Sequence, residues 1–179
     1  EPVREVDGVL WRRGAWVVGS EAFVATFAGA VAAVHVERGS VREVTNDELV
    51  RRLPEVTPRV QALVLDGFER RDVSPPPAAL RPLLAADRPG PVRVRAAARL
   101  AATGDPDAKR LLVDLARAPC TGEAPPADVA YAIERLPLAA PSPTAALAAF
   151  AALVADHGDA VAGPVTAGVV RLLDAAPRE

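Results

Sequence analysis

The sequence predicts a mainly α-helical protein of stacked helix pairs, with a small β or α+β segment at its N-terminus. The first observation is the dipeptide Arg-Leu, which occurs as Arg99-Leu100, Arg135-Leu136 and Arg171-Leu172, each 36 residues after the last. Each copy lies late in a short apolar helical pattern, and a period of this size is typical of stacked helical hairpins. The second is composition: 50% of the residues are hydrophobic and only 4% aromatic. Ala, Leu and Val must form the core, which favours closely packed helices.

Two domains are expected, residues 1–44 and residues 45–179. The first differs from the rest because it contains both tryptophans, Trp11 and Trp16, and several runs of β-branched residues. The second carries the repeated Arg-Leu pairs, which predict three antiparallel helix pairs. In that register the leucine of each pair occupies an equivalent buried position.

The first domain is expected to contain two hairpins and one helix. Residues 9–13 and 15–18 flank Gly14, which predicts either a first tight hairpin or a bulge. Residues 34–37 and 41–44 alternate apolar and polar side chains on either side of a glycine turn, and they predict the second. Between them we expect a helix that begins near Ser20, because four apolar side chains share one helical face: Phe23, Phe27, Val31 and Val34.

Helix signals are strong from Thr45 onward. Thr45 and Glu48 have the spacing of a capping box. Prolines and glycines separate the later apolar segments, and Asp105 followed by Pro106 marks a helix start. The expected helices are 45–53, 58–71, 78–87, 92–103, 106–118, 127–136, 145–156 and a last one from Val161 or Val165 to Ala175.

Residues 92–100, Val-Arg-Val-Arg-Ala-Ala-Ala-Arg-Leu, followed by Gly-Asp-Pro at 104–106, closely resemble the second helix of a bacterial HEAT repeat. The resemblance covers about residues 78–176, is strongest over 78–118, and leaves residues 1–44 unrecognised. It implies an α-α superhelix of HEAT-like helix pairs, an armadillo-like α-solenoid. Its inward-packing residues would include Val92, Ala96, Ala97 and Leu100.

The HEAT resemblance also implies a polar pair, Asp87 and Arg93. In that family an Asp in the turn and an Arg early in the second helix bond along the stack. We therefore expect Arg93 to bond to Asp87 or to the turn near it. Small residues recur at one position of the repeat, as Ala96, Ala132 and Gly168, and small size there lets neighbouring helices approach closely.

The charge and cysteine content exclude some classes of function. The net charge of −2 gives no general attraction to nucleic acid. Cys120 is the sole cysteine, so no intrachain disulfide is possible and the cytoplasm is favoured. No apolar run of about 18 residues predicts a transmembrane segment. The basic residues are nearly all Arg, as in a GC-rich bacterial genome, and the absence of Met indicates a processed or excised chain.

No residue pattern predicts catalysis, a metal or a cofactor. The sequence has no Gly-rich loop before Lys109 and none of the common hydrolase, metalloprotease or redox motifs. The stretch Asp156 to Asp159 offers one His and two carboxylates, which a helix end explains better than a metal site. His35 and Cys120 have no partner close in sequence.

We therefore expect a non-enzymatic protein–protein interaction module or scaffold whose partner is another protein. Stacked helix pairs expose an extended surface lined by their second helices. The candidate binding residues on that surface are Arg95, Arg99, Tyr131, Glu134, Arg135 and Arg171.

Two alternatives remain open. The chain could be a regulatory or catalytic fragment of a larger enzyme, with Trp11, Trp16 and His35 lining a pocket in the N-terminal segment. It could instead be a helical-repeat nucleic-acid binder, because Arg95 and Arg99 share a helical face. Nearby acidic residues make nucleic acid the weaker hypothesis.

Overall fold

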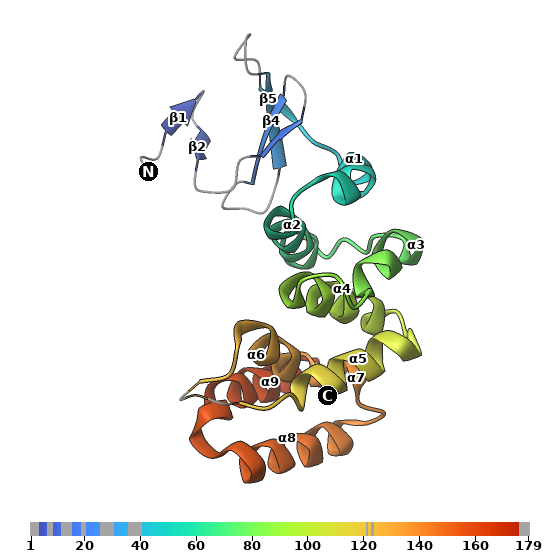
Figure 1. Cartoon of the computed structure of the whole chain (residues 1–179), viewed down its shortest axis with the longest axis vertical. Helices are drawn as coiled ribbons and strands as arrows, with labels where there is room; N and C mark the ends of the chain where they lie inside the picture. Colours follow the sequence, from blue (N-terminus) through green and yellow to red (C-terminus); the bar gives the residue numbers. More distant parts are fainter. Residues whose placement is uncertain are drawn as a thin grey trace. The chain divides into compact units, whose positions relative to one another are not determined.

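The computed structural model describes residues 4–6, 9–11, 16–18, 21–25, 31–35, 41–120, 122 and 124–175. Over this part the protein is mainly α-helical, as the sequence predicts. The chain divides into two compact units, Glu1–Ala79 and Leu80–Glu179. The first two helices, which the sequence analysis placed in the helical domain, lie in the first unit together with the strands (Figure 1).

The strands of the first unit form two antiparallel sheets. One sheet pairs β1 (Arg4–Val6) with β2 (Val9–Trp11). The other has the strand order β3-β4-β5-β6, in which each strand pairs with the next along the chain. Its strands are β3 (Trp16–Val18), β4 (Glu21–Ala25), β5 (Val31–His35) and β6 (Val41–Glu43).

The prediction of a helix that begins near Ser20 is wrong. Residues 21–25 and 31–35 are the antiparallel strands β4 and β5, with Phe23 opposite Ala33; Ser20 and Phe27 lie outside the described residues. Short apolar runs fit either a helical or a strand period, so pairing with neighbouring strands decides between the two.

One expected hairpin is present and the other is not. Strands β5 and β6 pair with Val34 opposite Val41, which confirms the second hairpin. A hairpin between residues 9–13 and 15–18 is wrong, because β2 pairs with β1 and β3 pairs with β4. The alternative, a bulge at Gly14, lies outside the described residues. A glycine between two apolar runs indicates where a strand ends, but it does not determine which strand pairs with it.

Two helices complete the described part of the first unit. α1 (Asn46–Arg52) begins at the predicted cap, where Thr45 Oγ1 accepts a hydrogen bond from the Glu48 amide at 3.3 Å. A 3₁₀ helix, Leu53–Glu55, follows. α2 (Pro58–Arg70) buries Phe68 completely. The strong local signals of cap and proline therefore fix both helices.

The second unit consists of short helices joined by tight turns. They are α3 (Pro77–Leu80, at the boundary of the units), α4 (Gly90–Ala102), α5 (Pro106–Ala116), α6 (Ala127–Glu134), α7 (Leu136–Ala139), α8 (Pro143–His157) and α9 (Ala162–Asp174). The helix expected over 78–87 is shorter than predicted. It becomes a 3₁₀ helix, Arg81–Leu84, because Pro82 has no amide hydrogen for an α-helical bond.

The start of α5 shows how local chemistry sets a helix boundary. Asp105 Oδ1 accepts hydrogen bonds from the amides of Asp107 and Ala108, both at 3.0 Å. The Ala108 amide bond, together with Arg81, holds the pKa of Asp105 below its usual value. Gly104 has φ +92°, a conformation that favours glycine, and it reverses the chain between α4 and α5.

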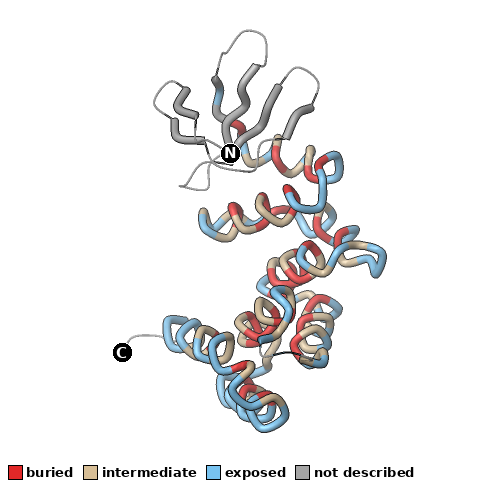
Figure 2. The backbone as a smooth tube through the Cα atoms, turned by 60° about the vertical axis from the view of Figure 1, so that its left-hand side comes forward, coloured by how far each residue is buried: buried red, intermediate tan, exposed pale blue. Residues whose placement is uncertain are grey.

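The core of the second unit lies where α4 meets α5 and α6. The predicted inward residues of α4 are all fully buried: Val92, Ala96, Ala97 and Leu100. α4 contacts α5 and α6, and α6 contacts α9. Figure 2 shows buried positions concentrated around α4 and mostly exposed ones along α8 and α9. Small residues at the repeated position, Ala96, Ala132 and Gly168, are all buried, as predicted.

The leucine register holds for two of its three positions. Leu100 and Leu136 are buried, but Leu172 is only partly buried, so equivalent burial of the three is wrong. α6 ends at Glu134, which places Leu136 at the start of α7 instead of late in a long helix. α9 packs on α6 and α8, and no described helix follows it to cover Leu172.

Candidate functional site

Five of the six predicted binding residues lie on α4 and at the C-terminal end of α6. The guanidinium carbons of Arg95 and Arg135 lie 4.7 Å and 4.3 Å from the centre of the Tyr131 ring. Both distances are within cation–π range. The contact between α4 and α6 therefore brings Arg95 next to Tyr131 and Arg135, which lie 36 or more positions later in the chain.

Arg135 is the buried member of this cluster. Its side chain is only 6% exposed and its Nη1 lies 3.1 Å from Oε2 of Glu134. The sequence analysis placed Arg135 on an accessible binding surface, and that part of the prediction is wrong. Because its guanidinium is enclosed against Tyr131 and Glu134, Arg135 supports the cluster from within.

The other members of the cluster are partly accessible to solvent. Arg95, Arg99, Tyr131 and Glu134 are all half-buried. Arg95 Nη1 also donates a hydrogen bond to the carbonyl of Pro91 at 3.0 Å, which limits its freedom. Arg171 is exposed on α9. We call Arg95, Arg99, Tyr131 and Glu134 the α4–α6 surface.

The polar pair Asp87 and Arg93 is not formed. Arg93 Nε donates to the carbonyl of Leu84 at 3.3 Å, so it bonds to the turn near Asp87, the other partner expected for it. Asp87 is exposed, and no ion pair joins it to Arg93 in the described part of the chain. The Leu84 carbonyl is at the end of a 3₁₀ helix and lacks a helical partner, so it is the better acceptor.

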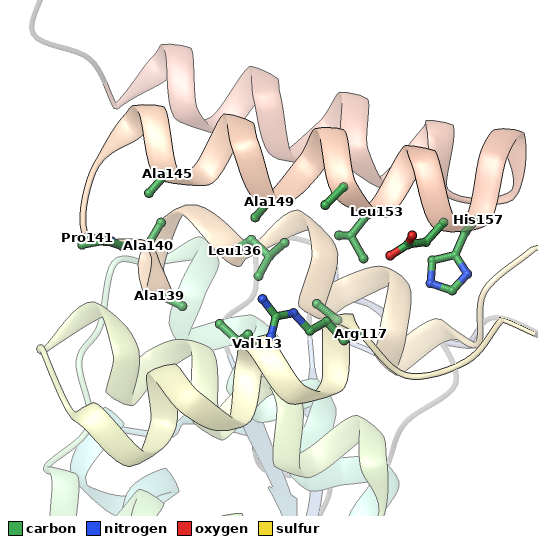
Figure 3. Close-up of a pocket in the computed structure, with 13 residues that line it drawn as sticks. Val113, Arg117, Leu136, Ala139, Ala140, Pro141, Ala145, Ala149, Leu153 and His157 are labelled. Atoms are coloured by element: carbon green, nitrogen blue, oxygen red, sulfur yellow. The ribbon is translucent and has the colours of Figure 1, made fainter.

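A cavity in the second unit was not predicted from the sequence. It has a volume of about 290 Å³ and lies among α5, α7 and α8 (Figure 3). Most of its lining is apolar and small, with three polar side chains, Arg117, Asp156 and His157. The alanines of residues 145–152 were a hint in the sequence, but only the packing of three helices makes them a cavity wall.

The large apolar side chains that are exposed in the described part of the chain lie on α8 and α9. Leu147 and Val154 are 48% and 42% exposed, and Val170 and Leu173 are 50% and 67% exposed. By length and composition alone, the 32 residues Pro143–Asp174 are apolar enough to cross a membrane. The chain bends at Gly158–Val161, so each of the two helices is shorter than the roughly 20 residues a membrane span needs.

The described residues offer no group of three or more His, Cys, Asp or Glu that could hold a metal ion. The side chains of Trp11, Trp16 and His35, the candidates for an N-terminal pocket, lie outside the described part. The backbone places Trp11 in β2 and Trp16 in β3, which belong to different sheets.

A comparison with protein-family models, curated proteins and solved structures finds no match to this chain. The HEAT resemblance of residues 78–176 therefore stays a prediction. The functional argument depends on the contacts, burial and charge of the described residues.

Proposed function

We propose that this protein is a non-enzymatic interaction module that binds another protein through HEAT-like second helices. The observation that carries the proposal is the stacking of Arg95 and Arg135 on Tyr131. Tyr and Arg are the residue types, with Trp, that contribute most to binding energy in protein interfaces. Here they are held together by two helices before any partner arrives.

Rigid support makes this surface suitable for binding. Arg135 is enclosed beneath Tyr131 and ion-paired to Glu134, and Arg95 is tied to the Pro91 carbonyl. Side chains that are already ordered lose less conformational entropy when a partner binds. The succession of contacts from α4 to α6 and from α6 to α9 supports a surface that extends over three second helices, as in a HEAT-like superhelix.

Nucleic acid is a weaker choice of partner for this surface. Phosphate binding depends on accessible cations, and Arg135 is buried beside a carboxylate. The net charge of −2 also gives no general attraction to a polyanion. We therefore favour a protein partner, and binding to a 20-base-pair DNA duplex at low salt is the observation that would reverse this choice.

The experiment is a quantitative capture of partners by the whole chain and three variants. Arg99→Glu and Tyr131→Leu alter the α4–α6 surface. Arg110→Glu is the matched control, because Arg110 lies on α5 with its side chain 71% exposed and pairs only loosely with Asp107, at 3.5 Å.

Partners retained by the unaltered chain should be identified and their Kd measured. We expect Arg99→Glu and Tyr131→Leu to weaken binding about tenfold or more, and Arg110→Glu to leave the Kd unchanged. Thermal melts of each variant separate loss of binding from loss of folding. Partners bound equally by all variants, or no partner at all, would reject the proposed surface.

A further inference from the structure

The cavity among α5, α7 and α8 is separate from the α4–α6 surface and uses different residues. α7 contacts both α5 and α8, and the cavity opens beside it. Its apolar lining consists of Val113, Ala116, Leu136, Ala139, Ala140, Pro141, Ala145, Ala149, Ala152 and Leu153. Only the apolar part of the lining offers water no hydrogen-bonding side chain, and a bound water needs two to four polar partners.

Small side chains keep this cavity open. Ala145, Ala149 and Ala152 follow one another at intervals of four and three residues along α8, so they share one helical face. Figure 3 shows Ala145 and Ala149 on the side of α8 that faces Leu136 and Val113, and Ala152 lines the same cavity. A larger residue at the middle position, Ala149, would occupy the space directly.

The volume indicates a small ligand. About 290 Å³ is just below the usual range of ligand-binding cavities, which run from about 300 to 1,000 Å³. At roughly 30 Å³ for a water-sized group, it accommodates a chain of about ten such groups, and a methylene group is of similar size. The lining runs along α8 from Ala145 to His157, so the space suits a linear aliphatic chain.

The polar side chains indicate what such a chain would carry at its end. Figure 3 shows Arg117 extending from the end of α5 into the cavity. In the described part of the chain, no carboxylate forms an ion pair with Arg117. An available guanidinium beside an apolar cavity matches a carboxylate, which it binds with two parallel hydrogen bonds. Asp156 also lines the cavity and opposes a bound anion, while His157 beside it is a further hydrogen-bonding group.

We infer that this cavity binds a medium-chain aliphatic carboxylate, with its chain against the alanines of α8 and its carboxylate at Arg117. The inference does not depend on the proposed protein-binding function. The cavity is lined by α5, α7 and α8, whereas the proposed interaction surface lies on α4 and α6.

The test uses the whole chain and three ten-carbon probes, namely decanoate, decanol and decylamine, each below its micelle concentration. Isothermal titration calorimetry should show saturable binding of decanoate at one site per chain. Because Arg117 favours the anion, decylamine should bind at least tenfold more weakly. Equal affinities for the three probes, or no binding of decanoate, would overturn the inference.

Four variants assign the site. Ala149→Leu fills the cavity and should abolish decanoate binding. Arg117→Gln removes the guanidinium of an exposed residue and should weaken binding about tenfold, while Asp156→Asn removes the opposing charge and should strengthen it several-fold. Arg110→Gln, on the same helix as the cavity wall but outside the lining, should leave the affinity unchanged.

The charge variants keep the inference testable even if Ala149→Leu fails to fold, because Arg117 and Asp156 are exposed and their replacement leaves the core intact. An effect of the opposite sign for either one would mean that the carboxylate does not lie at Arg117. Arg99→Glu and Tyr131→Leu should leave decanoate binding unaltered, so failure of the protein-binding proposal can be distinguished from failure of this one.

Discussion

Gly168 of α9 lies directly against the ring of Phe150 of α8. A Cβ atom built at Gly168 would stand 2.5 Å from Cζ of that ring and 3.3 Å from the carbonyl oxygen of Ile133 in α6. Atoms do not approach so closely, so any side chain at position 168 must displace its neighbours. The small residue predicted from the 36-residue spacing is therefore what lets α9 pack against both α6 and α8.

Gly168→Ala should destabilise the protein by about 1–3 kcal/mol, because the added methyl group overpacks the junction of three helices. Gly163→Ala is the matched control: it lies in the same helix, and a Cβ atom there meets nothing within 4 Å. The control should be neutral or stabilise the helix, since Ala has a higher helix propensity than Gly. Urea unfolding of both variants measures the difference, and equal changes would contradict the close packing at Gly168.

Leu100→Ala should lower the free energy of unfolding by about 2–5 kcal/mol, because it leaves a cavity in a fully buried site. Leu172→Ala, at the same position of the 36-residue repeat, should cost well under 2 kcal/mol, because Leu172 is only partly buried. Chemical denaturation of the two variants gives the comparison. A loss at Leu172 as large as that at Leu100 would mean that α9 is covered by further structure.

A double-mutant cycle between Asp87 and Arg93 should show no coupling beyond about 0.5 kcal/mol. Arg93→Ala removes the bond to the Leu84 carbonyl and should cost about 1 kcal/mol, whereas Asp87→Ala should be nearly neutral because Asp87 is exposed. Denaturant melts of the two single variants and the double variant supply the cycle. Strong coupling would restore the HEAT-like polar pair that the structure does not form.

The ion pair of Glu48 with Arg42 and Arg52 should make stability depend on pH. Arg42 donates to both Glu48 carboxylate oxygens, at 2.7 Å and 2.8 Å, and Arg52 donates at 3.1 Å. The hydrogen bonds from Arg42, with a smaller contribution from Arg52, lower the pKa of Glu48 from 4.5 to about 2. The carboxylate therefore stabilises the folded state above pH 4.5, and this contribution is lost as the pH falls toward 2.

The expected magnitude is about 1 kcal/mol, because the Arg42 side chain is 43% exposed and solvent screens the pair. Unfolding free energies measured between pH 2 and pH 6 should fall less steeply with acid in Glu48→Gln than in the unaltered chain. Identical pH profiles would show that the ion pair adds no stability.

The stack on Tyr131 should be measurable as stability as well as binding. Tyr131→Leu removes the aromatic ring that contacts Arg95 and Arg135. The free energy of unfolding should fall by about 1 kcal/mol, even though the leucine is partly buried in place of the ring. Arg95→Ala should cost about 0.5–1 kcal/mol more in the unaltered chain than in the Tyr131→Leu background, because only the unaltered chain loses the contact with the ring. Additive effects would show that Arg95 and Tyr131 are neighbours without an energetic contact.

The sequence by itself determined where several helices begin. The Thr45 cap, the Asp105 cap and the proline and glycine breaks act through bonds within a few residues of each boundary. The inward face of α4, with Val92, Ala96 and Leu100, was also predictable, because a helix fully covered by its neighbours shows its apolar period clearly. Local chemistry and periodicity suffice for such features.

Only the tertiary structure decided the features that depend on which elements meet. Residues 21–25 and 31–35 form strands because neighbouring strands pair with them. Arg135 is buried because the Tyr131 ring and Glu134 enclose it, although its place in the sequence is that of an exposed basic residue. The cavity beside α7 exists because three helices bring their alanines together. Such contacts join residues far apart in the chain, and no local pattern specifies them.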